Sequence, residues 1–560
     1  MKRLVRSTLS VLAAFSLLAF VSCGNGEKTT TTSTTAKTTG TNATGRTELN
    51  VMIEVEIESL DPQLATEGNA LEFIANFTDG LKQMNSDGST ANALCESETV
   101  SEDGLVYTFK IRDDAFWSNG DAVKADDFVF AWQRACDPKV ASEYSYMMSD
   151  IGQIKNAAKI QAGELGLEEL GATALDEKTL RVELEVPVSY FDSLLYFPTF
   201  YPMNRAFYEK CGDSYGTSPD TVLSNGAFVL TEYQPASLSL KLVKNDKYYD
   251  ADKIKVQALN YQILKDSQQA LMNYQNGDLD LIKISGDQVD SVKDDPEFLT
   301  VGSGFLWYIT PNIAKNADLA NIHMRRALTF AFERDSIVNE VVKDGSISAC
   351  VPVPSAYAFN ASGEDFTTKQ IPYPELCDSN AEKAKAELEE AKKELGKSSF
   401  HFTLIVDDTV IQQNVAAVIK DQIESTLEGV EIYIHVEPKK QRLQDMRSGD
   451  FELALTRWGP DYADPMTYLG MWVTGNDNNH GDWSNAEYDA LIEKCTTGEY
   501  CQEPQERWQA MKKASKMILE EAVIFPLYQQ SDACMLKSNV KGVDFHAIAL
   551  MRVFKGVTLQ

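Results

Sequence analysis

The sequence predicts an α/β fold with two lobes. Strand-like runs alternate with helical runs over about 500 residues that follow Thr47, and 43% of the whole chain is hydrophobic, which is enough for two or three domains. Two stretches also share one pattern, in which a helix ends at a glycine and a buried strand follows at once. They are Leu271–Ile282, with Gly277, and Gln444–Leu455, with Gly449. Two such joints far apart in the chain indicate two separate α/β lobes.

The individual elements follow from hydrophobic periodicity and from turn residues. The clearest helix spans Asn380–Leu395. Its interior is rich in Ala, Glu and Lys, Ser379 and Glu382 form a candidate capping box, and Gly396 offers a stop. We expect this helix to be solvated on one side and to cover a sheet. The predicted strands are Leu49–Ile57, Leu180–Val186, Leu238–Val243, Phe402–Val406 and Val430–Val436.

One block, Ala93–Arg134, combines several of these signals in order. An acidic turn at Glu102–Gly104 precedes an alternating strand over Val106–Ile111. A polar corner, Trp117–Asp121, then leads into a helix that begins near Asp126 and carries three aromatic residues. None of these pieces is unusual alone, so any information about function lies in their order and spacing.

The N-terminus is typical of an exported protein. Basic residues at positions 2, 3 and 6 precede an apolar run, Leu9–Val21, that is too short to favour a membrane-spanning helix. We therefore predict a signal peptide over residues 1–22. No other apolar stretch of the sequence approaches membrane-spanning length.

Cys23 is the predicted site of a lipid anchor. Lipidation needs a thiol directly after a small residue at the cleavage point, and Ser22 and Cys23 supply that pair. Residues 23–46 are rich in Thr and contain no aliphatic residue larger than alanine, so we predict an unfolded tether. Some twenty flexible residues reach roughly 25 Å, which holds a globule away from a membrane. The alternative is an ordinary signal peptide with a cysteine near its cleavage site.

The chain is strongly acidic. Its 52 Lys and Arg residues and 83 Asp and Glu residues give a formal net charge of −31. Such a surface repels nucleic acid and anionic lipid, so we expect no nucleic-acid partner and a membrane contact through the lipid alone. Solubility is a sufficient reason for the acidity. We expect an extracytoplasmic, lipid-anchored monomer.

Eight of the nine cysteines are left once Cys23 is assigned. An even number permits disulfides in an exported chain, and the absence of any CxxC pair argues against redox and zinc sites. Cys495 and Cys501 would close a short loop, where a bond adds little stability. Cys350 and Cys377 bracket a Pro-rich loop, where a bond would contribute ~3 kcal/mol. We expect no metal and no cofactor.

The order and spacing within Ala93–Arg134 resemble the signature block of the bacterial peptide- and nickel-binding family of extracytoplasmic solute-binding proteins, which deliver solutes to ABC importers. Further motifs match in family order along most of the chain, and the nearest subfamily is the oligopeptide-binding lipoproteins. These motifs are Ser59–Pro62, Thr66–Asn69, Asn225–Phe228, Met324–Leu328, Trp458–Pro465 and Trp483–Asp489. The resemblance implies a binding protein and not an enzyme.

The resemblance also implies a large two-lobed fold of the periplasmic-binding-protein type, with an extra domain inserted in the first lobe. On this pattern domain I consists of residues 47–80, 203–304 and 521–560, domain II of residues 81–202, and domain III of residues 305–520. The ligand would lie in a cleft between the lobes, which would close around it by a hinge motion.

The centre of the ligand site follows from the same resemblance. In oligopeptide-binding relatives the position of Asp461 receives the α-ammonium group of the peptide. A buried carboxylate suits this role because every free peptide carries that cation. The position of Trp458 lines a side-chain pocket in relatives, and Tyr462 belongs to the same element. The alternatives are that Asp461 caps a turn before Pro465 and that Trp458 is a core residue.

Four further residues complete the implied site. Glu67 and Tyr144 match the positions of a cleft carboxylate and a cleft tyrosine, with plain surface positions as the alternative. Trp307 and Tyr308 stand where the chain should cross between the lobes. They either line the cleft or pack the hinge.

The partner of the peptide carboxylate is left open. Relatives that hold this group often carry an arginine on the strand before the tryptophan, and the strand here offers Leu453, Leu455 and Arg457. The ligand length is open for the same reason. We expect the main chain of an extended peptide to pair with exposed strand edges.

The predicted function is that of a substrate-binding lipoprotein, which captures oligopeptides and delivers them to the permease subunits of an ABC importer. A dipeptide, an oligosaccharide, haem or a nickel chelate are alternative ligands, and a peptide-pheromone receptor is an alternative role. The sequence contains no G-x-S-x-G, Walker A or H-E-x-x-H motif. An acidic glycosidase that uses Asp461 and Asp464 is the enzymatic alternative.

Overall fold

The structure is a computed structural model. It describes residues 46–560 except positions 55, 58, 86–88, 234–237, 361, 368–372, 378 and 549. The predicted signal peptide, Cys23 and the tether as far as residue 45 lie outside the described residues. Within the described ranges, no helix combines the length and the hydropathy that crossing a membrane requires. Thr47–Gln560 form one unit.

A mixed sheet of 11 strands organises this unit. The strands follow the order β15-β14-β16-β12-β17-β11-β1-β10-β9-β8, and β13 pairs with β17. Their bounds are β15 Val430–Glu437, β14 Phe400–Asp407, β16 Leu453–Trp458, β12 Phe298–Pro311, β17 Phe525–Leu536, β11 Leu281–Ile284, β1 Glu48–Ile53, β10 Ala258–Ile263, β9 Ser239–Lys244, β8 Phe228–Glu232 and β13 Ile347–Ser348. Four of the five predicted strands belong to this sheet, with ends that shift by a few residues.

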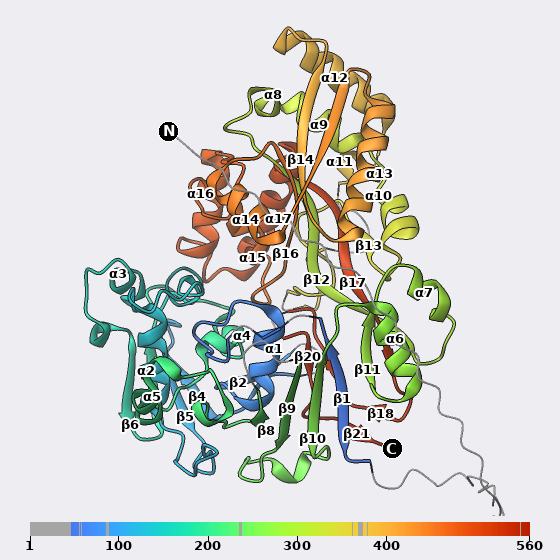
Figure 1. Ribbon diagram of the computed structural model, residues 1–560. Helices are drawn as coiled ribbons and strands as arrows, with labels where there is room; N and C mark the ends of the chain where they lie inside the picture. The colour runs from blue at the N-terminus through green and yellow to red at the C-terminus, as the bar shows by residue number, and fades with distance from the viewer. Residues whose placement is uncertain are drawn as a thin grey trace, which may run out of the picture. The chain divides into compact units, whose positions relative to one another are not determined.

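Two long strands, β12 and β17, join the two lobes of this α/β fold. They pair antiparallel, and Figure 1 shows them side by side between β11 and β16. The strands β11 and β16 are the strands of the two predicted helix–glycine–strand joints. Helix α6 (Ser267–Asn276) ends at Gly277 and α14 (Lys439–Ser448) ends at Gly449, and both glycines have positive φ. The joints are confirmed, but they belong to one continuous sheet, so the division into domains I, II and III stays a prediction.

A second, four-stranded antiparallel sheet lies within the predicted domain II. Its order is β4-β5-β7-β6, and it includes the fifth predicted strand. The bounds are β4 Cys95–Val100, β5 Val106–Ile111, β7 Thr179–Glu183 and β6 Ala172–Asp176. Helix α2 (Ala125–Cys136) packs on β6 and β7. The indole N–H of Trp117 donates to Asp127 at 2.9 Å and ties the polar corner to the first turn of α2. The strand and helix expected in this block are thus confirmed.

The other helices cover the sheets. Helix α13 packs on β14 and β15, and α12 packs on α9 and α13 (Figure 1). The bounds are α1 Gly68–Phe77, α3 Ala157–Gln161, α4 Phe191–Leu194, α5 Arg205–Cys211, α7 Asp287–Val292, α8 Ala317–Ala320, α9 Ile322–Phe330, α10 Arg334–Ser336, α11 Pro374–Cys377, α12 Ala381–Leu395, α13 Val410–Thr426, α15 Met466–Leu469, α16 Ala486–Thr496 and α17 Pro504–Glu520. Short strands are β2 Lys82–Met84, β3 Thr90–Asn92, β18 Val540–Lys541, β19 Asp544–Phe545, β20 Arg552–Val553 and β21 Thr558–Leu559.

The apolar core has two large parts. One surrounds β14 to β16 and includes Leu404 and Ile419. The other extends from β1 through the predicted domain II to α16 and α17, and it includes Phe73, Trp132 and Trp508. The second part is therefore continuous between segments that the predicted domain boundaries separate.

Helix α12 confirms the predicted helix but not its predicted cap. Asn380 is the N-cap, and its side chain accepts from the backbone N–H of Lys383 at 3.0 Å. The capping box of Ser379 and Glu382 is therefore wrong. Asparagine caps a helix as well as serine does, and Asn380 directly precedes the first helical residue. The helix ends at Gly396, with φ +66°, as expected.

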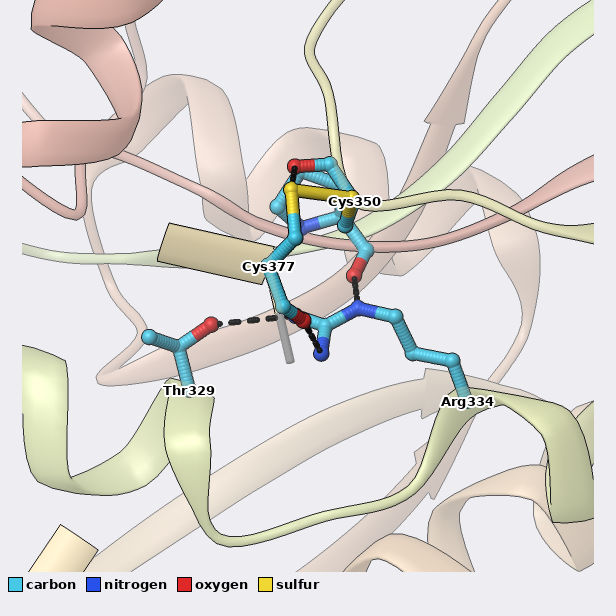
Figure 2. The surroundings of a disulfide bond; sticks show 5 residues. Thr329, Arg334, Cys350 and Cys377 are labelled. Atoms are coloured by element: carbon cyan, nitrogen blue, oxygen red, sulfur yellow. Dashed lines mark hydrogen bonds between the residues drawn. A yellow bond between two sulfur atoms is a disulfide. The ribbon is translucent and has the colours of Figure 1, made fainter. Parts of the chain in front are cut away.

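Cys350 and Cys377 form the disulfide that was expected for the Pro-rich loop, with Cα atoms 5.0 Å apart. Figure 2 shows Arg334 beside this bond. Its guanidinium donates to the Cys377 carbonyl at 3.2 Å and to the Thr329 hydroxyl at 3.2 Å. A third hydrogen bond, to the Pro526 carbonyl at 2.7 Å, ties the closed loop to β17.

The pairing of Cys495 with Cys501 is wrong, because both thiols are free. Cys495 lies on α16 with its thiol buried against α17, where it donates to the Arg507 carbonyl at 3.9 Å. Cys501 follows the turn after α16 and is partly exposed. Packing of α16 on α17 therefore directs the Cys495 thiol into the core.

Candidate functional site

Asp461 lies in the loop that follows β16. The strand ends three residues earlier, at Trp458. A Cβ on Gly459 would collide with the Phe305 ring, so glycine is what lets the loop pass this close to β12. The backbone N–H of Asp461 donates to the Thr467 hydroxyl at 3.2 Å, which ties the loop to α15. The Asp461 side chain is half-buried at this junction.

The Asp461 carboxylate has a polar partner but no cation. The Tyr146 hydroxyl donates to its Oδ2 at 2.9 Å. Among the residues that the structure describes, no Lys, Arg or His forms an ion pair with it. Burial raises the pKa of Asp461 to about 6, and the Tyr146 hydrogen bond offsets part of that rise. Any cation that enters the site would stabilise the ionised carboxylate.

A different aspartate holds the turn before α15. Oδ1 of Asp464 accepts from the backbone N–H of Met466 at 3.0 Å. The same carboxylate accepts from both terminal nitrogens of the Arg507 guanidinium, at 2.6 and 2.9 Å. The fold thus uses the Asp464 carboxylate, whereas the Asp461 carboxylate accepts from no backbone N–H in the part of the chain that the structure describes. A glycosidase needs both of its carboxylates for chemistry, and Asp464 is already bound to a guanidinium.

Among the described residues, three contacts join Tyr146 and Tyr190 of the predicted domain II to Asp461, Tyr462 and Arg507 of the predicted domain III. The first is the hydrogen bond between Tyr146 and Asp461. The second is the stacking of Tyr190 on Tyr462, with ring centroids 4.9 Å apart, and the third is the Arg507 guanidinium 5.4 Å from the Tyr190 centroid. Tyr462 is only 1% exposed, so in this conformation it contacts Tyr190 and offers no surface to a ligand.

The tyrosine whose hydroxyl contacts Asp461 is Tyr146, and Tyr144, the predicted cleft tyrosine, lies beside it. The two rings lie 5.9 Å apart, and Tyr144 packs on Phe197 at 4.9 Å. The sequence carried a signal for this, since two tyrosines flank Ser145. Residue spacing alone could not decide which hydroxyl reaches the carboxylate, because the chain there forms a short π-helix that follows Tyr146.

Glu67 caps helix α1. Its carboxylate accepts from the backbone N–H of Ala70 at 3.1 Å and from the Asn69 side chain at 3.2 Å. Burial raises the pKa of Glu67, while these hydrogen bonds and the charge of Lys439 lower it. Lys439 opens α14 of the predicted domain III, so Glu67 interacts electrostatically with the opposite lobe. The Glu67 carboxylate therefore already serves as a helix cap.

The aromatic residues of the predicted site divide into two groups. Trp458 is half-buried, and its indole N–H is buried without an acceptor among the described residues. Trp307 and Tyr308 are only 6% and 4% exposed. Trp307 stacks on Tyr528 at 5.9 Å, and Tyr308 packs edge-on against Trp472 at 5.9 Å. Both side chains therefore pack against other residues of the chain, Trp307 against strand β17 and Tyr308 against the segment that follows α15.

The gathered groups are suited to binding. Within the described part of the chain they offer one carboxylate without a counterion, a tyrosine hydroxyl and an indole N–H without an acceptor. The described residues contain no group of three or more His, Cys, Asp and Glu that could hold a metal ion. A ligand with an ammonium group and a hydrogen-bond acceptor nearby matches this set of partners.

Comparison with protein families gives one match over most of the chain. The model of the bacterial extracellular solute-binding proteins, family 5 (middle region), matches residues 90–480. A dipeptide-binding protein of Lactococcus lactis subsp. cremoris is 30% identical over 537 residues, which cover 93% of this chain and 96% of the relative.

Two solved structures resemble the whole described fold. One is the substrate-binding domain of an oligopeptide ABC transporter from Bacillus anthracis str. Ames, with a TM-score of 0.80, 35% identity, and coverage of 92% of this chain and 99% of that one. The other is Listeria monocytogenes OppA bound to peptide, with a TM-score of 0.80, 34% identity and the same coverage of 92% and 99%. Both lobes are therefore included in the similarity.

Proposed function

The chain belongs to family 5 of the bacterial extracellular solute-binding proteins, and from this premise we propose that it captures oligopeptides by their free ammonium group for an ABC importer. The names of its relatives support this ligand class. The Lactococcus lactis relative is dipeptide-binding, the Bacillus anthracis structure belongs to an oligopeptide ABC transporter, and the Listeria monocytogenes structure contains a peptide.

The observation that carries the proposal is the isolated carboxylate of Asp461. It is half-buried, it forms no ion pair with a described residue, and burial raises its pKa to about 6. An α-ammonium group would form charge-assisted hydrogen bonds with the Asp461 carboxylate. Tyr146 donates to Oδ2, so the ligand would use the remaining lone pairs. Recognition through the ammonium is independent of the peptide sequence, since every free peptide carries this group.

The rest of the peptide would form contacts that also do not depend on the peptide sequence. The buried indole N–H of Trp458 lacks an acceptor among the described residues, and a main-chain carbonyl would supply one. Strand pairing with a sheet edge would engage further main-chain groups. Side chains would occupy roomy pockets that water helps to fill, which reduces the differences between residues.

Closure of the lobes would couple peptide capture to delivery. Tyr146 and Tyr190 of the predicted domain II contact Asp461 and Tyr462 of the predicted domain III. A ligand that bridges the same two segments would stabilise the closed arrangement over the open one, and the permease would recognise the closed form.

The test is titration calorimetry with Asp461→Ala and with an N-acetylated peptide. Loss of one member of a buried charge pair costs ~2–5 kcal/mol, so Asp461→Ala should weaken binding of a free peptide by about 30-fold or more. N-acetylation of the peptide should weaken its binding to the parent by a comparable factor. The two losses should not add, because they remove the same interaction.

A matched control is Asp421→Ala, since Asp421 is an exposed aspartate on α13. This variant should bind the free peptide as the parent does. Equal binding of the free peptide by Asp461→Ala and the parent would remove Asp461 from the ammonium site. Failure of any peptide to bind the parent would remove the peptide ligand itself.

Native mass spectrometry of the purified protein distinguishes the alternative ligands. A ladder of co-purified peptide masses supports oligopeptide capture. A single small mass would indicate a dipeptide, an oligosaccharide, haem or a nickel chelate instead.

We also propose that Cys23 carries the lipid that holds the protein at the outer face of the membrane. The support is the sequence pattern at Ser22-Cys23 and the Thr-rich residues that follow it. Cys23→Ser should release the protein from the membrane fraction and should leave peptide affinity unchanged. Retention of Cys23→Ser in that fraction would contradict the anchor.

A further inference from the structure

Tyr190 of the predicted domain II places its ring against a loop of the predicted domain III. The ring stacks on Tyr462 with centroids 4.9 Å apart and an interplanar angle of 21°. The Arg507 guanidinium lies 5.4 Å from the centroid of the Tyr190 ring. Stacked aromatic pairs and cations over a ring face both stabilise a contact beyond the area that they bury. Tyr190 therefore contributes attraction between two segments that are far apart in the sequence.

The surface that receives the Tyr190 ring is formed by residues of the predicted domain III. The terminal nitrogens of the Arg507 guanidinium donate to Asp464 at 2.6 and 2.9 Å. Its Nε donates to the Cys495 carbonyl at 2.9 Å. Three hydrogen bonds within one predicted domain thus fix the orientation of the guanidinium, and Asp464 neutralises its charge. Tyr190 therefore meets a preformed surface and does not have to order it.

A second contact joins the same two predicted domains. The side-chain amide of Gln502 donates to the Asp103 carbonyl at 3.2 Å, and these residues are 399 positions apart. Gln502 lies two residues before the start of α17. On the other side, a Cβ on Gly104 would lie 3.3 Å from Pro187, so the turn that contains Asp103 packs against the segment that leads to Tyr190. Both contacts therefore join one part of the predicted domain II to the first turns of α17 and the residues beside them.

The Tyr190 contact is distinct from the polar groups of the proposed ligand site. The Asp461 carboxylate accepts from the Tyr146 hydroxyl, whereas the next side chain of the loop, Tyr462, packs on Tyr190. The resemblance to relatives placed Tyr462 among the ligand-binding residues, but in this structure its side chain is buried. A contact between two ring faces stabilises the contacted arrangement of the two segments directly, without a ligand.

We propose that Tyr190, together with the hydrogen bond between Gln502 and Asp103, is a latch that holds the predicted domains II and III in contact in the ligand-free protein. The latch stabilises the arrangement in which Tyr146 meets Asp461, and so it sets the fraction of ligand-free protein that already has this arrangement. The apparent affinity for any ligand that requires the arrangement scales with this fraction, so the latch changes all such affinities by one factor. For peptide affinity the inference rests on the proposed function, whereas the contact in the ligand-free protein does not.

The first test needs no ligand and compares Tyr190→Ala with the parent by small-angle X-ray scattering. Tyr190→Ala should shift the ligand-free protein toward a more open arrangement, which increases its radius of gyration. Tyr190→Phe keeps the ring and should match the parent. Tyr433→Ala removes a side chain of β15 that is 68% exposed, and this variant should match the parent as well. Equal radii of gyration for Tyr190→Ala and the parent would overturn the latch.

A milder variant covers the case in which Tyr190→Ala does not fold, as judged by circular dichroism. Gln502→Ala removes an exposed hydrogen bond and leaves the apolar core intact. It should increase the radius of gyration of the ligand-free protein in the same direction by a smaller amount. If Tyr190→Ala is unfolded and Gln502→Ala has the radius of the parent, the latch is overturned.

The second test measures peptide affinity by titration calorimetry. Tyr190→Ala should weaken binding of tri-alanine, tri-lysine and N-acetyl-tri-alanine by the same factor, roughly tenfold. The loss should add to the loss caused by acetylation, because the latch and the ammonium group act independently. A loss confined to one of these peptides would make Tyr190 a ligand contact and would overturn the latch. If no peptide binds the parent, the proposed function fails, whereas the scattering result still decides the latch.

Discussion

Two aspartates in the loop after β16 have opposite electrostatic surroundings. Asp464 binds the Arg507 guanidinium through two hydrogen bonds, at 2.6 and 2.9 Å, and both side chains are buried. Asp461 lies three residues earlier, and among the described residues its carboxylate has the Tyr146 hydroxyl, at 2.9 Å, as its hydrogen-bond donor, while burial raises its pKa to about 6. Arg507 of the same chain neutralises Asp464, whereas no described residue supplies a cation to Asp461.

On the proposed function, this difference separates a charge that stabilises the fold from a charge that binds the ligand. Breaking a buried pair is costly because the remaining charge has no counterion. A carboxylate that the fold leaves without a cation already bears that cost, and a ligand can relieve it.

The largest effect that we expect is on stability, at Asp464. Asp464→Ala should lower the free energy of unfolding by about 3–5 kcal/mol, because Arg507 would keep a buried charge without a counterion. Urea denaturation followed by circular dichroism measures the change. The double variant Asp464→Ala, Arg507→Met should recover part of the loss. Equal loss in the single and double variants would contradict the role given to the ion pair.

Asp461 should behave in the opposite way. The folded state raises the pKa of Asp461, so the ligand-free parent binds this proton more tightly than its unfolded chain does. The parent therefore loses stability as the pH rises from about 4 to about 6, and Asp461→Asn does not. At pH 7 the variant should be the more stable, by on the order of 1 kcal/mol, and at pH 4 the two should match. An Asp461→Asn protein that is less stable than the parent at pH 7 would mean that the fold uses this carboxylate.

A smaller effect is expected at the tyrosine that contacts Asp461. Tyr146→Phe removes a hydrogen bond worth about 1 kcal/mol, so peptide affinity should fall by roughly fivefold at pH 7.5. The lost hydrogen bond lowers the pKa of Asp461 in the parent, so the pH at which binding weakens should also move upward. Tyr144→Phe is the matched control and should change neither quantity. A larger loss for Tyr144→Phe would reverse the assignment of the two hydroxyls.

Local features of the chain were predictable from the sequence. The glycines at 277 and 449 needed only the left-handed conformation that ends a helix, and both joints are present. The helix α12 and the strand β5 followed from periodicity in the same way. The cap of α12 was misplaced by one residue, because Ser379 and Asn380 are both good caps and the choice depends on the backbone.

Features that depend on contacts between distant residues were not predictable. Arg507 reaches Asp464 across 43 residues, and Tyr146 reaches Asp461 across 315. No local pattern specifies which of two aspartates in one loop receives the arginine. The burial of Tyr462 under Tyr190 likewise arises only when separate segments pack together. The resemblance to a family therefore indicated Asp461, but its electrostatic state required the fold.

Proton release on peptide binding tests most directly whether the ammonium group of the ligand binds the Asp461 carboxylate. At pH 6 about half of the Asp461 side chains carry a proton, and an arriving ammonium group should displace it. Calorimetry at this pH in buffers of different ionisation enthalpy should give about half a proton released per free peptide bound by the parent. Asp461→Asn should release none. Equal proton release by the parent and by Asp461→Asn, or none by either, would contradict the role of Asp461.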